Sequence, residues 1–402
     1  MTAGKYLLQA MEAAIRGGHV DWQALTQQEW QELTALARQQ YVLPLLVEVV
    51  WPCSAFRALP QPLQQQARAE ARRQIVAQTM RTQMLLALSQ KMAAADLHPL
   101  VMKGVLCRGI YSNPDARPSS DEDLLVPQEE FSAAADFLTG LGCRRMGKED
   151  CGQAFEVGFI TPEGLHIELH CRPFAPELGA LSGANEWFAA AHQRAVTYPV
   201  GEGTVNGMNP HDHMLYLILH AFKHLIHRGF GLRQVCDILL WGEHYRTEID
   251  WDELERQCAA LRAWGFARAV FAIGREQFGV ELPGSAEDGG MGEALLKDLL
   301  AGGVFGGEEP GRMHSATITL SAVESDRKGE RTSLSRTLFP SRSSMEGKYP
   351  YLRKYPFLLP VAWLQRILRY GAQPKAEGER AADSLRIGRE RTELLRKLDV
   401  ID

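Results

Sequence analysis

The amino-acid sequence predicts an α+β fold in which a small mixed β-sheet follows an N-terminal helical region and precedes a helical C-terminal domain. Residues 1–95 are rich in Ala, Leu, Gln and Arg, with apolar residues at helical spacing. After His98, short apolar runs bounded by turn residues, such as LHPLVMKG and DEDLLVP, predict buried strands. From about residue 207 the helical pattern returns, beginning with PHDHMLYLILHAFKHLIHRG.

The composition is that of an ordinary globular protein. The chain has 402 residues, of which 45% are hydrophobic and 23% charged. Such a length predicts roughly two to three domains, or one core with helical additions. The net charge of −5 gives no overall basic field. Nothing in the total therefore requires a polyanion partner, although a local basic patch is compatible with it.

Cysteine use and hydropathy indicate a cytoplasmic protein with no membrane partner. The seven cysteines are odd in number and never spaced C-x-x-C, a pattern typical of reduced thiols rather than of a disulfide framework or a zinc site. The first residues, interrupted by Lys5, Glu12 and Arg16, lack the apolar core of a signal peptide. No run approaches the roughly 20 apolar residues of a membrane span.

Several local signals place the first helices and the strands. Thr26 with Glu29, and Asp21 with the residues after it, predict helix starts. A short helix over VLCRGIYS, a turn-rich loop over NPDARPSS and a helix over 128–141 are expected around the strand DEDLLVP. CRRMG predicts an edge strand, and AFEVGFI and LHIELHCR predict a hairpin joined by Thr-Pro-Glu-Gly, because Pro162 presets φ and Gly164 accepts a positive φ.

These patterns divide the chain into five parts. They are an N-terminal helical region (1–95), a core of mixed sheet (96–200), a helical domain that completes a cleft (201–282), a Gly-rich loop region (283–335) and a C-terminal aromatic and helical region (336–402).

Three acidic residues in the mixed-sheet segment form the candidate metal site. Strand side chains alternate between faces, so Asp121 and Asp123 point one way and Glu122 the other. Two carboxylates so close repel unless a cation lies between them, and Mg²⁺ prefers carboxylate and phosphate oxygens. Glu168, in HIELHCR, can join them from a neighbouring strand. Three such acids can hold two ions about 3.5–4 Å apart, although Asp-x-Asp also occurs at solvated strand ends.

The residues before the acids point to an anionic ligand. Lys103 and Gly104 end one strand and open a helix, and a glycine there lets the backbone approach a triphosphate closely. The N-terminus of the following helix favours anionic groups. Ser119 and Ser120 supply hydroxyls beside the two aspartates.

The run MKGVLCRGIYSNPDARPSSDEDLLV resembles the signature of a bacterial family of uncharacterised nucleotidyltransferases, a branch of the polymerase-β superfold. The third acid of that family precedes Leu-His, as Glu168 does here. HAFKHLIHRGFGLRQVCDILLW and LFPSRSSMEGKYPYLRKYPFLLPVAWLQR resemble later segments of the family, so the likeness runs from about residue 80 to 370. The residues that carry it are Lys103, Gly104, Tyr111, Arg117, Asp121, Asp123, His220, His224, Arg233 and Asp237.

The resemblance implies a metal-dependent enzyme that moves a nucleoside monophosphate group from a nucleoside triphosphate, ATP among them, to an acceptor with release of pyrophosphate. Two Mg²⁺ ions, or Mn²⁺, would be held by Asp121, Asp123 and Glu168, the last as a ligand or as a base. Better-known members of the superfold carry Gly-Ser after the first strand, whereas Val105 follows the glycine here. The nucleotide-binding residues implied are Lys103, Gly104, Arg117, Ser119, Ser120, His220 and His224.

The acceptor stays open between a small molecule, a peptide or protein, and an RNA, with the overall charge arguing against RNA. The oligomeric state is not predicted. Two other classes of function remain: a kinase-like phosphotransferase on the same fold, which would release ADP, and a regulatory protein that binds nucleotides without catalysis.

Three further signals have structural alternatives. His220, His224 and His227 share one helical face, where zinc binding competes with a buried or nucleotide-facing role. Arg233 and Asp237 can pair at i, i+4 or contact substrate. The stretch KYPYLRKYP (348–356) can contact a nucleic acid or a triphosphate, or form a surface helix or turn.

Overall fold

The computed structural model describes residues 2–147, 154–175, 181–227, 229–285, 289–302, 351–371 and 377–402, together with Thr319, Val323, Arg342, Met345 and Tyr349. Most of the expected Gly-rich loop region, 303–335, lies outside the described residues, as do Cys151 and part of the 348–356 stretch.

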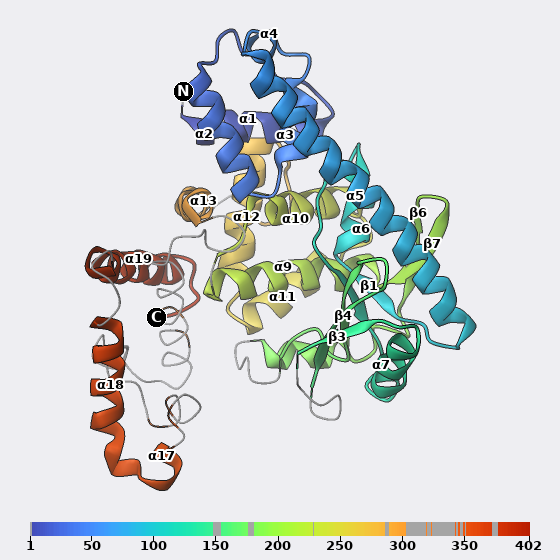
Figure 1. Cartoon of the computed structure of the whole chain (residues 1–402), viewed down its shortest axis with the longest axis vertical. Helices are drawn as coiled ribbons and strands as arrows, with labels where there is room; N and C mark the ends of the chain where they lie inside the picture. The colour runs from blue at the N-terminus through green and yellow to red at the C-terminus, as the bar shows by residue number, and fades with distance from the viewer. Residues whose placement is uncertain are drawn as a thin grey trace.

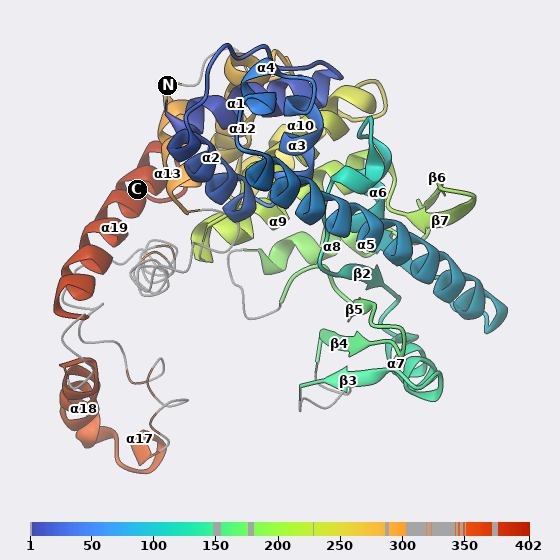
Figure 2. The same ribbon diagram turned by 45° about the horizontal axis from the view of Figure 1, so that its top comes forward.

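The N-terminal region is helical as predicted. Thr26 and Glu29 form a reciprocal capping box, whereas no helix begins at Asp21, so that prediction was wrong. The longest of these helices, α5 (Gln61–Ala94), starts in the N-terminal region and continues past it alongside the sheet (Figure 2). The five helices are α1 (Ala3–Arg16), α2 (Gln27–Gln39), α3 (Leu43–Val50), α4 (Ser54–Arg57) and α5 (Gln61–Ala94).

A mixed sheet of seven described strands forms the centre of the fold, in the order β3-β4-β5-β2-β1-β7-β6. β2 pairs antiparallel with β1 and parallel with β5, and β1 pairs parallel with β7. The fold is therefore α+β with a mixed sheet, as the sequence predicts. The strands are β1 (Leu100–Met102), β2 (Glu122–Leu125), β3 (Arg144–Met146), β4 (Glu156–Ile160), β5 (His166–His170), β6 (Val196–Val200) and β7 (Gly203–Gly207).

The predicted connections within the sheet are confirmed. α6 (Gly104–Gly109) and the short 3-10 turn η1 (Pro114–Ala116) lie between β1 and β2, and α7 (Phe131–Gly140) precedes β3, which is an edge strand. β4 and β5 form the expected hairpin, in which Gly164 has a φ of +92°.

The hairpin of β6 and β7 was not predicted. Val196, Tyr198 and Val200 alternate along β6 as a strand pattern requires, but Pro199 argues against a central strand. The structure resolves the conflict by placing β6 at the sheet edge, where a missing backbone donor breaks no further pairing.

The second half of the described chain is a helical bundle that packs against the N-terminal helices. α1 contacts α12, and α9 packs between α10 and α11 (Figure 1). The buried side chains of these helices and of the sheet belong to one hydrophobic core. The helices are α8 (Asn185–Phe188), α9 (Pro210–His227), α10 (Leu232–His244), α11 (Trp251–Ala260), α12 (Trp264–Phe278) and α13 (Met291–Gly302).

The last part of the chain has a small apolar cluster of its own. Met345, Tyr349, Leu352 and Ala362 are buried together, apart from the main core. The elements here are α17 (Tyr351–Lys354), η3 (Pro356–Leu358), α18 (Leu359–Gly371) and α19 (Glu377–Lys397), and α19 packs on α13.

The six cysteines among the described residues are free thiols. In the described part of the chain, no helix is both long and apolar enough to cross a membrane.

Candidate active site

The strand register brings two of the predicted acids together. Asp123 of β2 pairs with Glu168 of the parallel strand β5, so their side chains leave the same face of the sheet. Asp123 is 1% exposed. Asp121 lies just before β2, and its carboxylate accepts a hydrogen bond from the hydroxyl of Ser120 at 2.9 Å.

The ammonium of Lys103 lies between the two aspartates. Its Nζ is 3.0 Å from Asp123 Oδ2 and 3.9 Å from Asp121 Oδ2. Although burial lowers the pKa of Lys103, the charges of Asp123 and Asp121 raise it well above its usual value. The lysine therefore stays charged and offsets the repulsion between the carboxylates.

His170 completes the acidic cluster. Its Nε2 lies 3.2 Å from Asp123 Oδ1 and 3.7 Å from Glu168 Oε2, and its Nδ1 lies 3.5 Å from Glu156 Oε2. Burial lowers the pKa of His170, but the hydrogen bonds to Asp123 and Glu168 raise it to about 9. The same bond from His170 lowers the pKa of Glu168, which is therefore ionised at neutral pH.

These residues can hold a divalent cation. One ligand atom each from Asp123, Glu168 and His170 lies within 4.8 Å of the others. Among the described residues, the buried Asp123 Oδ2 has an ion-pair contact with the Lys103 ammonium but no hydrogen bond of good geometry. A metal ion bound to this oxygen would share it with Lys103 or displace the ammonium. The two carboxylates are oxygen ligands of the kind that Mg²⁺ or Mn²⁺ prefers, whereas the imidazole would have to lose its proton to act as a third ligand.

A strained turn fixes the position of Lys103. Lys103 and Gly104 both have positive φ, +42° and +38°. On one side the backbone N–H of Lys103 donates to His213 Nε2 at 3.0 Å, and on the other Val105 N–H donates to Glu122 Oε2 at 3.2 Å. Glu122 faces away from Asp123, as predicted, and forms a buried ion pair with Arg108 at 2.7 Å.

The structure gives Gly104 a different reason from the predicted one. A Cβ at this position would lie 2.2 Å from Glu122 Oε2. The anion at the start of α6 is thus the protein's own Glu122, whose carboxylate takes the Val105 amide. Close approach of the backbone to a phosphate is not needed to explain the glycine.

Replacing Gly104 by Ala is expected to destabilise the protein by about 2–4 kcal/mol, because overpacking and an unfavourable φ act together. Urea unfolding measures this. Gly109→Ala in the same helix is the control, since a Cβ there meets nothing within 4 Å. Equal stability of the two variants would contradict the proposed constraint.

The buried imidazole of His213 predicts a loss of stability in acid. Burial lowers the pKa of His213 to about 3, below the usual 6.5. Between these two values the imidazole is protonated in the unfolded chain and neutral in the folded protein. Stability from this residue is present above about pH 6.5 and falls as the pH drops toward 3. Between pH 7 and 5 the wild type should lose about 2 kcal/mol that His213→Gln does not, a difference measurable by unfolding both proteins at each pH. Parallel pH profiles would contradict this.

A pocket of about 80 Å³ opens beside the acids, between the sheet and helices α9 and α10. Ligand pockets for whole small molecules are typically about 300–1,000 Å³, so this one has room for a phosphate group and not for a nucleotide. Every residue for which nucleotide binding was predicted lines it: Lys103, Gly104, Arg117, Ser119, Ser120, His220 and His224.

Arg117 lines the pocket, but its charge is already matched. Its Nη2 and Nε donate to the two oxygens of Asp237 at 2.5 and 3.0 Å, and both residues are buried. Tyr111 donates a third hydrogen bond to the same carboxylate at 2.9 Å. Asp237 therefore pairs with Arg117, and of the two alternatives left open for Arg233 and Asp237 the mutual pair does not form. The contacts favour a positioning role for Arg117.

Arg233 also lines the pocket, and its sequence position left its role open between pairing with Asp237 and contacting substrate. Its Nη1 donates to the Pro118 carbonyl at 2.6 Å, its guanidinium lies 5.6 Å from the ring centre of Tyr41, and no carboxylate lies within 4.0 Å of it among the described residues. Burial and the neighbouring Arg117 lower its pKa. The charges of Asp237 and Asp121 partly offset these effects, and an anion in the pocket would offset them further.

His220 and His224 form the pocket wall on α9, with ring centres 4.6 Å apart. Burial and the charge of Lys103 lower the pKa of both, that of His224 to about 3. Neutral imidazoles can donate to a phosphate oxygen without adding charge. Among the described residues, the ligand-type cluster around Asp123 is the one with ion-binding geometry, so the zinc alternative for these histidines has no support.

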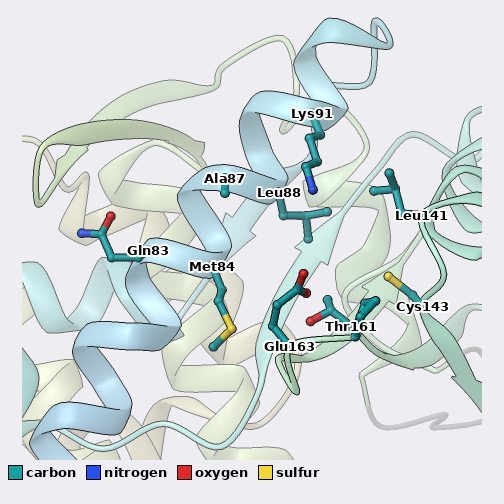
Figure 3. Close-up of a pocket in the computed structure, with 10 residues that line it drawn as sticks. Gln83, Met84, Ala87, Leu88, Lys91, Leu141, Cys143, Thr161 and Glu163 are labelled. Atoms are coloured by element: carbon teal, nitrogen blue, oxygen red, sulfur yellow. The ribbon is translucent and has the colours of Figure 1, made fainter.

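A larger pocket of about 270 Å³ lies elsewhere, between α5 and the turn that joins β4 to β5 (Figure 3). Its walls are mostly apolar, with Met84 and Leu88 on one side and Leu141 on the other, while Lys91 and Glu163 point into it. It borders the start of β5 rather than the His170 end and gathers no cluster of acids. The smaller pocket therefore remains the candidate site.

The sequence matches the family described as uncharacterised nucleotidyltransferase over residues 26–279. The chain belongs to this family. The match contains all the acids and pocket residues and ends before the C-terminal aromatic region, so the expected likeness there is not part of it.

Curated proteins and solved structures give no further information about the site. No curated protein matches the chain. Among solved structures, the crystal structure of an antigenic nucleotidyltransferase-like protein from Paracoccidioides brasiliensis is similar, with 13% identity over 50% of this chain and 93% of that chain and a TM-score of 0.31. At that TM-score the likeness supports no conclusion about the site.

His170 is the cluster residue that the sequence analysis did not assign. It stands two positions after Glu168 on a strand, and the alternation that pairs Asp121 with Asp123 pairs these two as well. That signal was sufficient to find it.

Proposed function

We propose that the protein is a metal-dependent nucleotidyltransferase that transfers a nucleoside monophosphate group from a nucleoside triphosphate to an acceptor and releases pyrophosphate. The observation that carries the proposal is the meeting of an ionised acidic cluster with a cation-lined, phosphate-sized pocket. Lys103 contacts Asp123 and also lines the pocket, together with Arg233 and two neutral histidines.

The chain's own residues account for metal binding. Asp123, Glu168 and His170 would hold a divalent cation. Asp121, whose carboxylate lies 3.9 Å from the Lys103 ammonium, would be a further ligand. When bound, such cations neutralise the triphosphate and activate the attacking oxygen. The lowered pKa of Glu168 makes it a weak base, so we assign it a ligand's role rather than a base's.

The pocket would bind the terminal part of the triphosphate. Arg233 would bind a terminal phosphate, His220 and His224 would donate hydrogen bonds, and Lys103 would share its charge between Asp123 and the phosphates. Ser120 is exposed and lines the pocket, so its hydroxyl could leave Asp121 for a phosphate, whereas the buried Ser119 hydroxyl bonds Gln78 and Glu122. Since positioning and charge neutralisation supply most of the rate in phosphoryl transfer, no further catalytic group is required.

Removing the Arg233 charge is expected to weaken triphosphate binding by roughly 10- to 100-fold, as for one charge-assisted hydrogen bond. The measurement is titration of Mg²⁺ and ATP into Arg233→Met, with AMP as a ligand that lacks the terminal phosphates and should lose less. Arg246→Met, an exposed arginine away from the pocket, is the control. An equal loss for AMP and ATP would refute the terminal-phosphate assignment.

Labelled triphosphates test the reaction. The protein is incubated with Mg²⁺, fractions of small molecules, peptides or RNA, and each triphosphate labelled at the α- or the γ-phosphorus. Transfer of the α-label with release of pyrophosphate is the expected result. Transfer of the γ-label with release of a diphosphate would show a phosphotransferase instead, and tight binding with neither transfer would show a regulatory protein.

A further inference from the structure

The chain carries a basic segment near its C-terminal end. Residues 347–376 contain six Lys and Arg and no Asp or Glu, although the whole chain has a net charge of −5. The segment lies beyond residue 279, where the family match ends, so the properties that place the chain in its family do not account for it.

The same segment exposes large apolar side chains. Phe357 is 75% exposed, Leu364 56%, and Tyr355 and Val361 42% each. Val361 and Leu364 lie three residues apart on α18 and so share one side of the helix, and η3 presents Phe357 just before it. Lys354, exposed at the end of α17, adds a positive charge beside them.

The other side of α18 packs against the small apolar cluster described above. Ala362 is fully buried against Leu352 and Met345, with Leu359 and Trp363 packed around them. This small cluster holds the helix by one face and leaves the face of Val361 and Leu364 outward. In Figure 1 α17 and α18 stand apart from the sheet and its helices.

We propose that this surface, made of Tyr355, Phe357, Val361 and Leu364 within the basic segment, docks the protein on an anionic lipid membrane. A helix with exposed aromatic and aliphatic side chains and a surplus of Lys and Arg lies in the interface of such a membrane, where apolar groups enter the acyl boundary and cations meet the headgroups. Docking of this kind departs from the expectation of no membrane partner, which rested on the lack of a signal peptide and of a spanning run, because a helix lying on the surface needs no apolar run of spanning length.

The chemistry favours lipid over nucleic acid. Both attract cations, and Tyr355 and Phe357 could stack on bases, but Val361 and Leu364 have no ring to stack and would gain by burial among acyl chains.

Vesicle sedimentation of the full-length protein tests the proposal. Wild type is expected to bind vesicles of phosphatidylcholine mixed with phosphatidylglycerol, to bind phosphatidylcholine alone much less, and to be released by salt. Phe357→Ser/Val361→Ser/Leu364→Ser should bind the anionic vesicles at least tenfold more weakly, with an unchanged circular dichroism spectrum because these side chains are exposed.

Val76→Ser/Met80→Ser is the matched control, since both residues are exposed apolar side chains on α5, 57% and 59%. It should bind vesicles like wild type. Absence of binding to anionic vesicles, or an equal loss in the control, would overturn the proposal. Binding of the wild type to a single-stranded oligonucleotide but not to vesicles would also overturn it. The same holds if the wild type is a dimer in solution and the triple variant is a monomer.

Discussion

Replacing Asp123 by Asn should lower kcat for nucleotidyl transfer by about a thousandfold or more. The change removes a proposed metal ligand and leaves Lys103 and His170 without the carboxylate that contacts both. Loss of charge stabilisation worth several kcal/mol corresponds to a factor of this size, because each 1.36 kcal/mol changes the rate tenfold. Initial rates with the α-labelled triphosphate, at saturating Mg²⁺, measure it.

Asp136→Asn is the matched control for this variant. Asp136 is an exposed carboxylate on α7, outside the cluster, and should retain wild-type turnover. Circular dichroism establishes that Asp123→Asn is folded. A folded Asp123→Asn protein with more than a tenth of the wild-type rate would rule out Asp123 as a central ligand.

Asp237→Ala should destabilise the fold by about 3–5 kcal/mol, because it strands the buried guanidinium of Arg117 without a counter-charge. Both residues have side chains only 3% exposed, and Tyr111 loses its acceptor as well. The midpoint of urea unfolding measures the loss. The variant should also perturb the turn at Gly104, whose carbonyl accepts a hydrogen bond from Arg117 at 3.3 Å.

A second variant separates the stranded charge from a simple cavity. In Arg117→Met/Asp237→Leu both charges are replaced by apolar groups of similar size, and much of the lost stability should return. If the double variant is as unstable as Asp237→Ala, the loss comes from packing or from Tyr111 and not from the unpaired charge.

The parts of the site that obey short-range rules could be predicted from the sequence. Strand alternation placed Asp123 and Glu122 on opposite faces, and the apolar run before Lys103 marked the strand that ends there. The same rule applied to Glu168 and His170 would have added the histidine.

Features that depend on contacts between distant residues could not be predicted in this way. The partner of Arg117 is 120 positions away on α10, so the i, i+4 spacing could offer Asp237 only Arg233, a pair that was left open against a substrate contact. Gly104 was explained by a phosphate, whereas its neighbour is Glu122, which a chain pattern alone does not bring to the turn. Pro199 in β6 is compatible with a sheet only at an edge or a strand end, and the edge position is known only once the sheet is assembled.

The most direct test of the central claim is a calorimetric titration of ATP, GTP, CTP and UTP into the wild type and Asp123→Asn, each with Mg²⁺ and with EDTA. The account predicts metal-dependent binding of at least one triphosphate by the wild type, abolished by EDTA and lost in the variant. Absence of binding to all four in the presence of Mg²⁺, or binding that persists unchanged in EDTA and in Asp123→Asn, would contradict it.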